Sequence, residues 1–459
     1  MKDKVRFANK ATRARRFVYD PEAQQLEEMP SSFLHALRFV VKHGLPAAML
    51  RDLSFAFAKI GSALFADNSA GNVLEGGSFA TVHEFFRSHF SRHFAERFAS
   101  AFVHGIFLGS SQQLLLKYAF PALWQRQVAY DSVLVGALLD PYLQLSQCYD
   151  EAPTVSLALS PADQADFAMA LQQAQSERVA SLEGGLATLT TRLHEHVRKE
   201  QVEVYLRTKV THMACEGKRV EVHTETEASE GASEPQRTTF AATAVASTLP
   251  PPALTTVMKN SLASLELTAP QQRRAQAAIA RLHSITSLSL AVVTVVFEGR
   301  QFAQLVNKVD AQPGFGFLVP EGPTRGLVLG VVYDSCVFPE LAGEATGVFT
   351  IMLGGADPNL QQKVEQATTA DLESWALAAL SQHLGVVDEA SSLHVTKWMQ
   401  AIPQFDAAYS RARSGLQQLL RTNLPWLFVT GKAFGTGEFD VESRYIDTSS
   451  WYCCRGGGQ

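Results

Sequence analysis

Residues 314–320 read GFGFLVP, so aromatic side chains alternate with glycines before a Leu-Val-Pro ending. Glycine in a strand lets a flat ligand come close to the backbone while neighbouring rings line it. A glycine-rich hairpin with core aromatics explains the same pattern. The stretch therefore predicts strand structure here and leaves open whether it binds a ligand.

Two later segments and one earlier segment also have the pattern of strands. Residues 329–339 read LGVVYDSCVFP, a strand that enters a polar turn, and residues 351–355 read IMLGG, a strand stopped by glycines. The longest uncharged apolar run, residues 284–297, is rich in Val, Leu and Thr. It is shorter than the about 20 residues that span a bilayer, so it predicts a buried strand.

The rest of the chain mixes helical and strand patterns, which predicts a mixed α/β (α+β) fold. Residues 13–30 predict a short strand, a turn and the start of a helical region, and apolar residues then recur at helical spacing from Phe33 to about Gln147. Leu249-Pro250-Pro251-Pro252 ends a strand predicted at 239–248 and is the best candidate for a domain boundary. We also predict helices at 186–197, 270–281, 370–384 and 407–420, and strands at 17–19, 202–206, 220–222, 327–333, 347–353 and 427–430.

Composition narrows the class of protein. The 459 residues suggest about two to four domains, and the net charge of −5 gives no reason to expect a nucleic-acid partner. The five cysteines have the spacing of neither a disulfide framework nor a zinc site, which predicts reduced thiols in an intracellular protein. Many of the 28 Phe lie between Phe33 and Phe120 among basic residues. An aromatic helical core and a membrane-contacting surface explain them equally well.

Common catalytic motifs are missing from the sequence. It contains no GxGxxG, GxxxxGK[ST], HExxH or GxSxG, the motifs of dinucleotide, nucleotide, zinc and serine-hydrolase sites. No His and Cys residues cluster at metal-ligand spacing. From the residues alone we predict no metal site and identify no catalytic acid, base or nucleophile.

Taken together and in order, residues 314–320, 329–339 and 351–355 resemble the protoporphyrinogen oxidase family. Its members carry GFGxLVP, then LGxVYDSxxFP, then a strand ending MLGG. Weaker similarities lie at RFVY (16–19) before MPSS (29–32), TVHEF (81–85), HGIFLG (104–109), SLEGG (181–185) and IPQF (402–405). The resemblance covers about residues 13–437.

The resemblance implies a three-part architecture. A Rossmann-like FAD/NAD(P)-binding domain is assembled from separated segments, beside a mixed-sheet substrate domain and a helical membrane-binding domain. Its first βαβ unit would be missing from this chain. The implied parts are 1–29 (remnant of an FAD or substrate segment), 30–150 (helical), 151–252 (FAD segment), 253–425 (substrate-binding) and 426–459 (atypical C-terminal FAD segment).

The implied reaction oxidises protoporphyrinogen IX to protoporphyrin IX in haem biosynthesis, with FAD as cofactor and dioxygen as acceptor. Such a site needs few acids and bases, because the flavin takes hydride and the protein positions a large apolar macrocycle. The resemblance implies that Phe315, Leu318 and Met352 line this slot near the backbone of Gly105, with Phe315 over a pyrrole ring. It implies cofactor contacts at Val210, Ala433, Gly437, Glu438 and Phe439.

Partners and location also follow from the resemblance. It implies peripheral membrane association and a possible homodimer. In a eukaryote the location would be the inner mitochondrial membrane, and otherwise the cytoplasm or a membrane surface.

Three features depart from the family. The strand–GxGxxG–helix unit is absent, which leaves the FAD pyrophosphate without a helix N-terminus, so we expect weak FAD binding by the chain as written. The sequence after Gly437 does not follow the family's V-x-V-x-D/R-C-I pattern. The arginine that the family places after its proline turn is missing from residues 31–34, and Arg38 lies one turn further on.

These departures keep two alternatives open. One is another flavin amine-oxidase-type oxidoreductase, and the other is a non-catalytic porphyrin-binding or partner-binding remnant. A gene start placed too late would explain the absent unit without either alternative.

Overall fold

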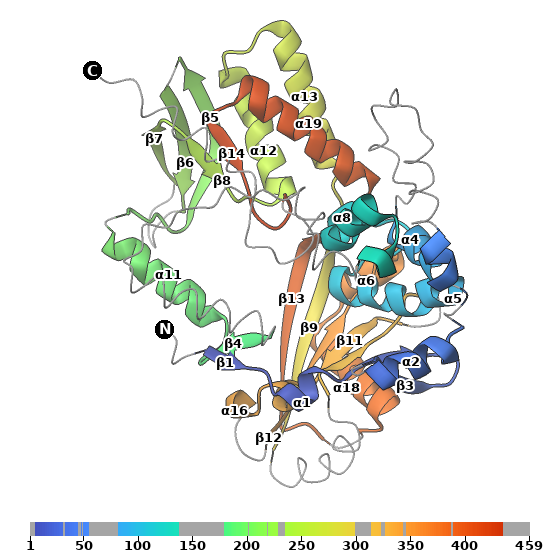
Figure 1. Ribbon diagram of the computed structural model, residues 1–459. Helices are drawn as coiled ribbons and strands as arrows, with labels where there is room; N and C mark the ends of the chain where they lie inside the picture. Colours follow the sequence, from blue (N-terminus) through green and yellow to red (C-terminus); the bar gives the residue numbers. More distant parts are fainter. Residues whose placement is uncertain are drawn as a thin grey trace, which may run out of the picture.

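The computed structural model describes residues 5–30, 33–44, 47, 49–54, 81–136, 179–200, 202–217, 219–227, 235–298, 314–322, 326–342, 346–386 and 389–434. Three groups of elements are visible in Figure 1: a seven-stranded sheet, a group of short helices beside it, and an α/β group that contains a three-stranded sheet. Among the described residues, no helix has the length and apolarity that crossing a bilayer requires.

The seven-stranded sheet has the order β13-β9-β12-β11-β10-β2-β3. It is mixed, because β2 and β10 run parallel while the other neighbouring pairs run antiparallel. The strands are β2 (Arg16–Asp20), β3 (Gln25–Glu28), β9 (Ser287–Glu298), β10 (Gly316–Leu318), β11 (Val328–Val332), β12 (Thr346–Leu353) and β13 (Ser392–Pro403). The strands predicted at 17–19, 284–297, 327–333 and 347–353 are confirmed.

Helices α17 (Pro358–Gln366) and α18 (Thr369–Leu384) cover one face of this sheet. Val293 and Phe297 of β9 are fully buried in one apolar cluster with Leu372 of α18. A capping box between Thr368 and Asp371 begins α18. We call this side the core face. The opposite face carries Leu318 of β10 and Met352 of β12, because side chains alternate along a strand.

The helical group lies on the opposite face. It consists of α2 (Phe33–Lys42), α4 (Val82–His89), α5 (Arg92–Phe94), the π-helix η3 (Ala95–Ala99), α6 (Ser100–Phe107), α7 (Leu116–Ala119) and α8 (Pro121–Tyr130). Helix α6 contacts both β10 and β11. The helical prediction is confirmed for the described part of residues 33–136, and its remaining residues lie outside the described ranges.

The α/β group joins distant parts of the chain. Strands β5 (Thr208–Glu216), β6 (Arg219–Thr226) and β7 (Gln236–Ala242) form an antiparallel sheet, while β8 (Val245–Ser247) and β14 (Leu427–Val429) form a separate parallel pair. Helices α12 (Pro251–Ser261), α13 (Ala269–His283) and α19 (Ala407–Asn423), with the 3-10 turn η5 (Leu262–Ser264), pack beside these strands (Figure 1). The helices and strand predicted at 270–281, 407–420 and 427–430 are confirmed.

The remaining elements come from distant parts of the chain and lie near the N-terminus in space (Figure 1). Strand β1 (Val5–Phe7) pairs antiparallel with β4 (Ala180–Leu182). The others are α1 (Lys10–Arg13), α11 (Ala187–Lys199), α15 (Asp334–Val337) and α16 (Pro339–Ala342). Helix α11 confirms the helix predicted at 186–197.

Three sequence predictions are wrong in detail. Residues 25–28 form β3 and pair with β2, where we expected the start of a helix. Residues 202–206 form no strand, and their apolar side chains are exposed. The single strand predicted at 239–248 is two strands, β7 and β8, which join different sheets. Alternating polarity shows which residues could face a core, but pairing partners decide whether a strand forms.

The proline run at 250–252 both follows β8 and begins α12, since proline is tolerated in the first turn of a helix. Leu254 of α12 packs in the same apolar cluster as Met213 of β5. The domain boundary placed at this run stays a prediction.

Candidate functional site

Four residues form a row across neighbouring strands on the opposite face. Val18 pairs with Leu318, Leu318 pairs with Gly330, and Gly330 pairs with Met352. Residues paired in register project to the same side of a sheet. We call Val18, Leu318, Gly330 and Met352 the central row. It brings two of the residues predicted for the substrate slot, Leu318 and Met352, onto one surface with a glycine between them.

The Leu318 side chain fills the space between two glycines. A methyl group at Gly105 of α6 would overlap Leu318 Cδ2. A methyl group at Gly330 would lie 2.9 Å from the same carbon and 2.6 Å from the backbone oxygen of Phe317. The contacts of an added methyl group are too short for ordinary packing at Gly105 and at Gly330. Helix α6 and strand β11 therefore approach each other only because both positions are glycine.

Hydrogen bonds fix α6 against the chain around β10. The His104 Nδ1–H donates to the Val319 carbonyl over 3.0 Å, and the Glu321 backbone N–H donates to Ser100 Oγ over 2.9 Å. Gly105 therefore lies beside Leu318, and the assignment of both residues to a substrate slot stays a prediction. Near Gly105, Leu108 is buried in a further apolar cluster against which Met352 packs.

Phe315 lies at the end of this surface, just before β10, and is half-buried. Its N–H donates to the Arg15 carbonyl over 2.8 Å, and its carbonyl accepts from the Tyr333 N–H over 3.0 Å. The guanidinium carbon of Arg16 lies 5.5 Å from the centre of the Phe315 ring, within cation–π range. One side of this ring is therefore already covered by a cation, which the sequence did not predict.

A cavity of about 220 Å³ lies in the helical group. It is lined by Ala99 and by five phenylalanines: Phe86, Phe94, Phe98, Phe102 and Phe120. Phe98 belongs to the same apolar cluster as Val18 and Leu318, so the cavity adjoins the central row. The abundance of Phe was visible in the sequence, but its arrangement around a cavity depends on how the short helices pack.

A buried ionic network lies further along the same face. The Arg97 Nη2 atom of η3 is 2.5 Å from an Asp20 carboxylate oxygen and 2.6 Å from a Glu27 carboxylate oxygen. Glu27 also accepts from Lys42 and, over 2.9 Å, pairs with His43 Nε2. Burial opposes charge on Asp20 and Glu27, yet their hydrogen bonds and the nearby cations hold the pKa of each below its usual value.

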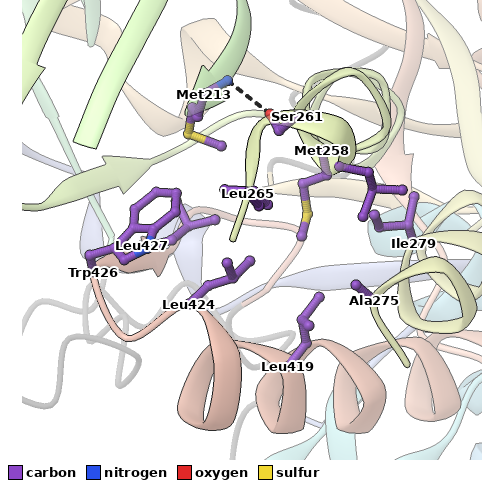
Figure 2. Close-up of a pocket in the computed structure, with 11 residues that line it drawn as sticks. Met213, Met258, Ser261, Leu265, Ala275, Ile279, Leu419, Leu424, Trp426 and Leu427 are labelled. Carbon is purple, nitrogen blue, oxygen red and sulfur yellow. Dashed lines mark hydrogen bonds between the residues drawn. The ribbon is translucent and has the colours of Figure 1, made fainter. Parts of the chain in front are cut away.

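A second pocket, shown in Figure 2, belongs to the core of the α/β group. Its volume of about 10 Å³ leaves room for about one water molecule at most. The Ser261 hydroxyl accepts from the Met213 N–H over 2.8 Å and donates to the Val257 carbonyl over 2.7 Å. Met258, Leu419 and Trp426 close the space around it (Figure 2). This pocket is packed core and holds no substrate-sized ligand.

The parallel pair β8–β14 offers a place for a cofactor. Ligands of open α/β sheets bind outside the carboxyl ends of the strands. Both strands end at one turn, where the Thr430 N–H donates to the Ser247 carbonyl over 2.9 Å and the Phe434 N–H donates to Gly431 over 2.9 Å. Ala433 lies in this turn and is 8% exposed. Ala433 packs in the same apolar cluster as Val429 of β14, and its contact with a flavin stays a prediction.

The other predicted cofactor residues divide into two sets. Val210 lies half-buried on β5, next to a register shift between Val210 and His212. It packs against the same apolar cluster that contains Ala433. Gly437, Glu438 and Phe439 lie outside the described residues.

Within the described part of the chain, no group of three or more His, Cys, Asp or Glu is placed to hold a metal ion.

The central row and its surroundings are chemically simple. Leucine, valine, methionine and phenylalanine side chains dominate, and the polar groups nearby pair with one another in the Arg97 network. Such a surface is suited to positioning a large apolar ligand. Sequence reasoning did not single out Gly330, although it lies within the quoted stretch 329–339 and its role depends on the register of β10 with β11.

The chain is similar in sequence to a family of flavoenzymes and to individual members of it. Residues 3–441 match the family of flavin containing amine oxidoreductases. Protoporphyrinogen oxidase of Bos taurus is 28% identical over 351 residues, which are 75% of this chain and 63% of that protein. The mitochondrial protoporphyrinogen oxidase of Nicotiana tabacum is 23% identical over 366 residues, which are 78% and 64% of the two chains. The chain thus covers a little under two thirds of these relatives.

Solved structures show a similar fold. A protein of Exiguobacterium sp., provisionally assigned as a protoporphyrinogen oxidase, superimposes with a TM-score of 0.60 at 16% identity. The match covers 99% of this chain and 82% of that one. It confirms the predicted mixed α/β fold of flavin-dependent oxidases.

Proposed function

The chain belongs to the family of flavin-containing amine oxidoreductases, and we propose that within this family it oxidises protoporphyrinogen IX to protoporphyrin IX with dioxygen as acceptor. Membership makes it an oxidoreductase whose cofactor is a flavin, as the sequence predicted with FAD. The specific reaction is supported by the names of the similar proteins from Bos taurus and Nicotiana tabacum.

The observation that carries the proposal is the central row beside Gly105. Leu318 and Met352 project from β10 and β12, the two strands on either side of Gly330 in β11, and α6 approaches through Gly105. Together with Phe315 at one end, this makes a mostly apolar surface that a large macrocycle could lie against. A porphyrinogen is a large, mostly apolar ring, so its fit depends on surface shape more than on charged groups.

The residues then have defined tasks. Leu318, Met352 and Phe315, all half-buried, would hold the macrocycle by apolar and ring contacts that leave no room for water between ring and protein. The turn with Ala433, together with Val210, would hold the flavin. When bound, a flavin supplies hydride acceptance and passes electrons to dioxygen. With a bound flavin as the hydride acceptor, the central row would have to orient the macrocycle, and the proton released with each hydride would pass to solvent.

The test uses the full chain supplied with FAD. Protoporphyrinogen is added without oxygen, air is then admitted, and porphyrin fluorescence and hydrogen peroxide are measured against a heat-inactivated sample. We expect porphyrin to form faster than by spontaneous oxidation, with peroxide rising in step. Turnover of an amine in place of porphyrinogen would favour another oxidase of the family, and porphyrin binding without turnover would favour a non-catalytic role.

We also propose that the helical group, within predicted domain 30–150, contacts a membrane surface. Val41, Leu50 and Ile106 are 64%, 70% and 45% exposed, and the basic residues Lys42 and Arg51 adjoin them in the sequence. Exposed apolar side chains beside cations suit an anionic lipid surface.

Sedimentation with vesicles of phosphatidylcholine and phosphatidylserine tests the membrane proposal. Leu50→Glu should reduce the bound fraction, whereas Leu193→Glu, at an exposed leucine of α11, should leave it unchanged. Equal losses for both variants would contradict a surface centred on the helical group. The inner mitochondrial membrane and a homodimer rest on the resemblance, and sedimentation velocity in detergent tests the homodimer.

A further inference from the structure

Two histidines stack on each other across neighbouring strands of the three-stranded sheet. His212 of β5 pairs in register with His223 of β6. The centres of the two rings are 4.1 Å apart, and the ring planes differ by 3°. Both residues are half-buried. Their spacing in the sequence predicted no metal site, because only the register of β5 with β6 brings the two rings together.

This histidine pair lies on the outer face of the sheet. Met213 follows His212 and is buried in the apolar cluster that contains Leu254 of α12. Because successive side chains of a strand point to opposite faces, His212 points away from this core. Thr239 of β7 pairs with His223 and is exposed. Ions from solvent can therefore reach the histidine pair.

Threonine hydroxyls hold the Nδ1 atoms of both rings. Thr211 Oγ1 donates to the His223 carbonyl over 3.1 Å, so it accepts from the His212 Nδ1–H, also over 3.1 Å. The Thr239 hydroxyl lies 3.0 Å from His223 Nδ1 and can accept from it. With a proton on each Nδ1, each Nε2 presents a lone pair. A hydrogen bond at the other ring nitrogen orients the imidazoles of metal sites in the same way.

The charges around the pair favour a cation. Burial and the neighbouring His223 lower the pKa of His212, so its ring is neutral at pH 7, the form that binds metals. Glu221 Oε2 lies 3.8 Å from His223 Nε2, while Glu221 Oε1 lies 3.5 Å from Arg219 Nη2. One oxygen of this carboxylate therefore brings negative charge to the histidine pair.

We propose that His212 and His223 bind one divalent transition-metal ion, such as Zn²⁺ or Ni²⁺, through their Nε2 atoms. Imidazole suits these ions, whereas Mg²⁺ and Ca²⁺ prefer oxygen ligands. The two rings would turn towards one ion at about 2.0–2.1 Å from each nitrogen, with Glu221 adding charge and water completing the coordination. The ion would clamp β5 to β6. This inference depends on neither a flavin nor a porphyrinogen.

The test titrates the full chain, first freed of metal with EDTA, with NiCl₂ in a calorimeter. Nickel is chosen because it prefers imidazole, while zinc also binds thiolates. His212→Gln and His223→Gln should each weaken binding by more than about tenfold, since even loss of a partner that only orients a ligand costs that much. Glu221→Gln should weaken binding by a smaller factor.

Two variants test whether the geometry matters. Thr211→Val keeps both imidazoles but removes the acceptor for His212 Nδ1–H, and it should weaken binding by about tenfold to a hundredfold. His194→Gln is the matched control, because His194 is an exposed histidine of α11. It should bind nickel as the wild type does.

Hydrogen exchange locates the bound ion. Saturating Ni²⁺ should protect peptides from β5 and β6 and raise the melting temperature of the wild type, because the ion binds both strands only while they are paired. Neither effect should appear in His212→Gln or His223→Gln.

Each outcome supports or overturns the site. Loss of affinity in both histidine variants, with protection confined to β5 and β6, supports it. Equal affinity in the wild type and both histidine variants would mean an adventitious ion bound elsewhere, and the site would be overturned. If the histidine variants do not fold, Thr211→Val decides, since an unchanged affinity there also overturns the site.

Discussion

At the scale of single residues, the close approach of α6 to the sheet rests on two glycines with different neighbours. The atom nearest an added methyl group at Gly105 is the tip of the flexible Leu318 side chain. At Gly330 the nearest atom is a backbone oxygen, that of Phe317 at 2.6 Å. A side-chain tip can rotate away, whereas a strand backbone cannot move without breaking its ladder.

We therefore expect Gly330→Ala to destabilise the protein by about 1–3 kcal/mol, the usual range for overpacking. Gly105→Ala should cost less, because Leu318 can rotate and alanine favours helix over glycine by about 1 kcal/mol. Urea unfolding of both variants measures the difference. Equal destabilisation would show that the Leu318 side chain is as fixed as the backbone.

His383 gives a second prediction at this scale. Its ring contacts the rings of Tyr19 and Phe317, at centroid distances of 4.3 and 5.2 Å, and within the described residues its Nδ1 is buried without a hydrogen-bond partner. Burial lowers its pKa to about 4, against about 6.5 in an unfolded chain. The unfolded state therefore binds the proton more readily, so stability is lost as pH falls from about 6.5 towards 4.

Replacement by a ring that does not titrate should remove this loss. In His383→Phe the free energy of unfolding should fall less between pH 7 and pH 5 than in the wild type, by about 1–3 kcal/mol. Urea titrations at both pH values measure it. Asp20 and Glu27, with lowered pKa values, titrate below this window and are common to both proteins. An identical pH dependence would mean that the His383 site is open to water.

At the scale of elements, the π-helix η3 links the helical group to the sheet. Its Arg97 bridges Asp20 of β2 and Glu27 of β3, so one side chain fixes a hairpin against the helices. Arg97→Met should destabilise the protein by about 3–5 kcal/mol, because Asp20 is left buried without its cation, while Glu27 loses one partner and keeps Lys42 and His43.

Arg92 provides the control for this prediction. It pairs with Glu96 over 2.7 Å on the exposed side of the neighbouring turn, and exposed pairs contribute little. Arg92→Ala should therefore leave the urea midpoint nearly unchanged. If Arg97→Met is as mild as Arg92→Ala, water reaches Asp20 and Glu27 and the link is weaker than the geometry indicates.

Elements with strong periodicity were predictable from the sequence. β9 is an uncharged run buried on the core face, and α18 has a capping box and an apolar stripe. β13 and α17 were missed for physical reasons. β13 carries the exposed residues Trp398 and Met399 beside an irregular register, which hides its alternation. α17 buries only Val364 among its residues, so it presents almost no stripe.

The candidate site, too, could be predicted only in part from the sequence. The resemblance pointed to Leu318, Met352, Phe315 and Gly105. The structure places Leu318 and Met352 on one face with Gly105 beside Leu318, and their role in a substrate slot stays a prediction. The role of Gly330 and the position of Arg16 over the Phe315 ring depend on which strands pair and in what register. That information is tertiary: Arg15 and Arg16 are equivalent in the sequence and lie on opposite faces of the sheet.

At the scale of the whole molecule, apolar clusters tie together segments far apart in the chain. One cluster contains Val82 and Phe107 of the helical group, Leu254 of α12 and Leu427 of β14. A separate cluster contains β9, β12 and α18 residues, among them Val293, Leu353 and Leu372. The helical group therefore shares its core with the α/β group, although it also lies against the seven-stranded sheet.

This division predicts two regions of local stability. Leu254 and Leu353 are both fully buried, one in each cluster, and truncation of either to alanine should cost about 2–5 kcal/mol. Cores that open separately lose protection from hydrogen exchange separately. Leu254→Ala should therefore speed amide exchange in α12 and α6 while leaving β9 and β12 protected, and Leu353→Ala should do the reverse.

Hydrogen exchange read by mass spectrometry distinguishes the alternatives, since peptides from β9 and α12 report the two clusters independently. If either substitution accelerates both sets equally, the two clusters open as one unit. The contact of α6 with β10 and β11 through Gly105 would then couple them strongly. In that case ligand binding at the central row should protect α12 as well as β9. With separate opening, the same ligand should protect β10 and β11 and leave distant α12 peptides at their unliganded rates.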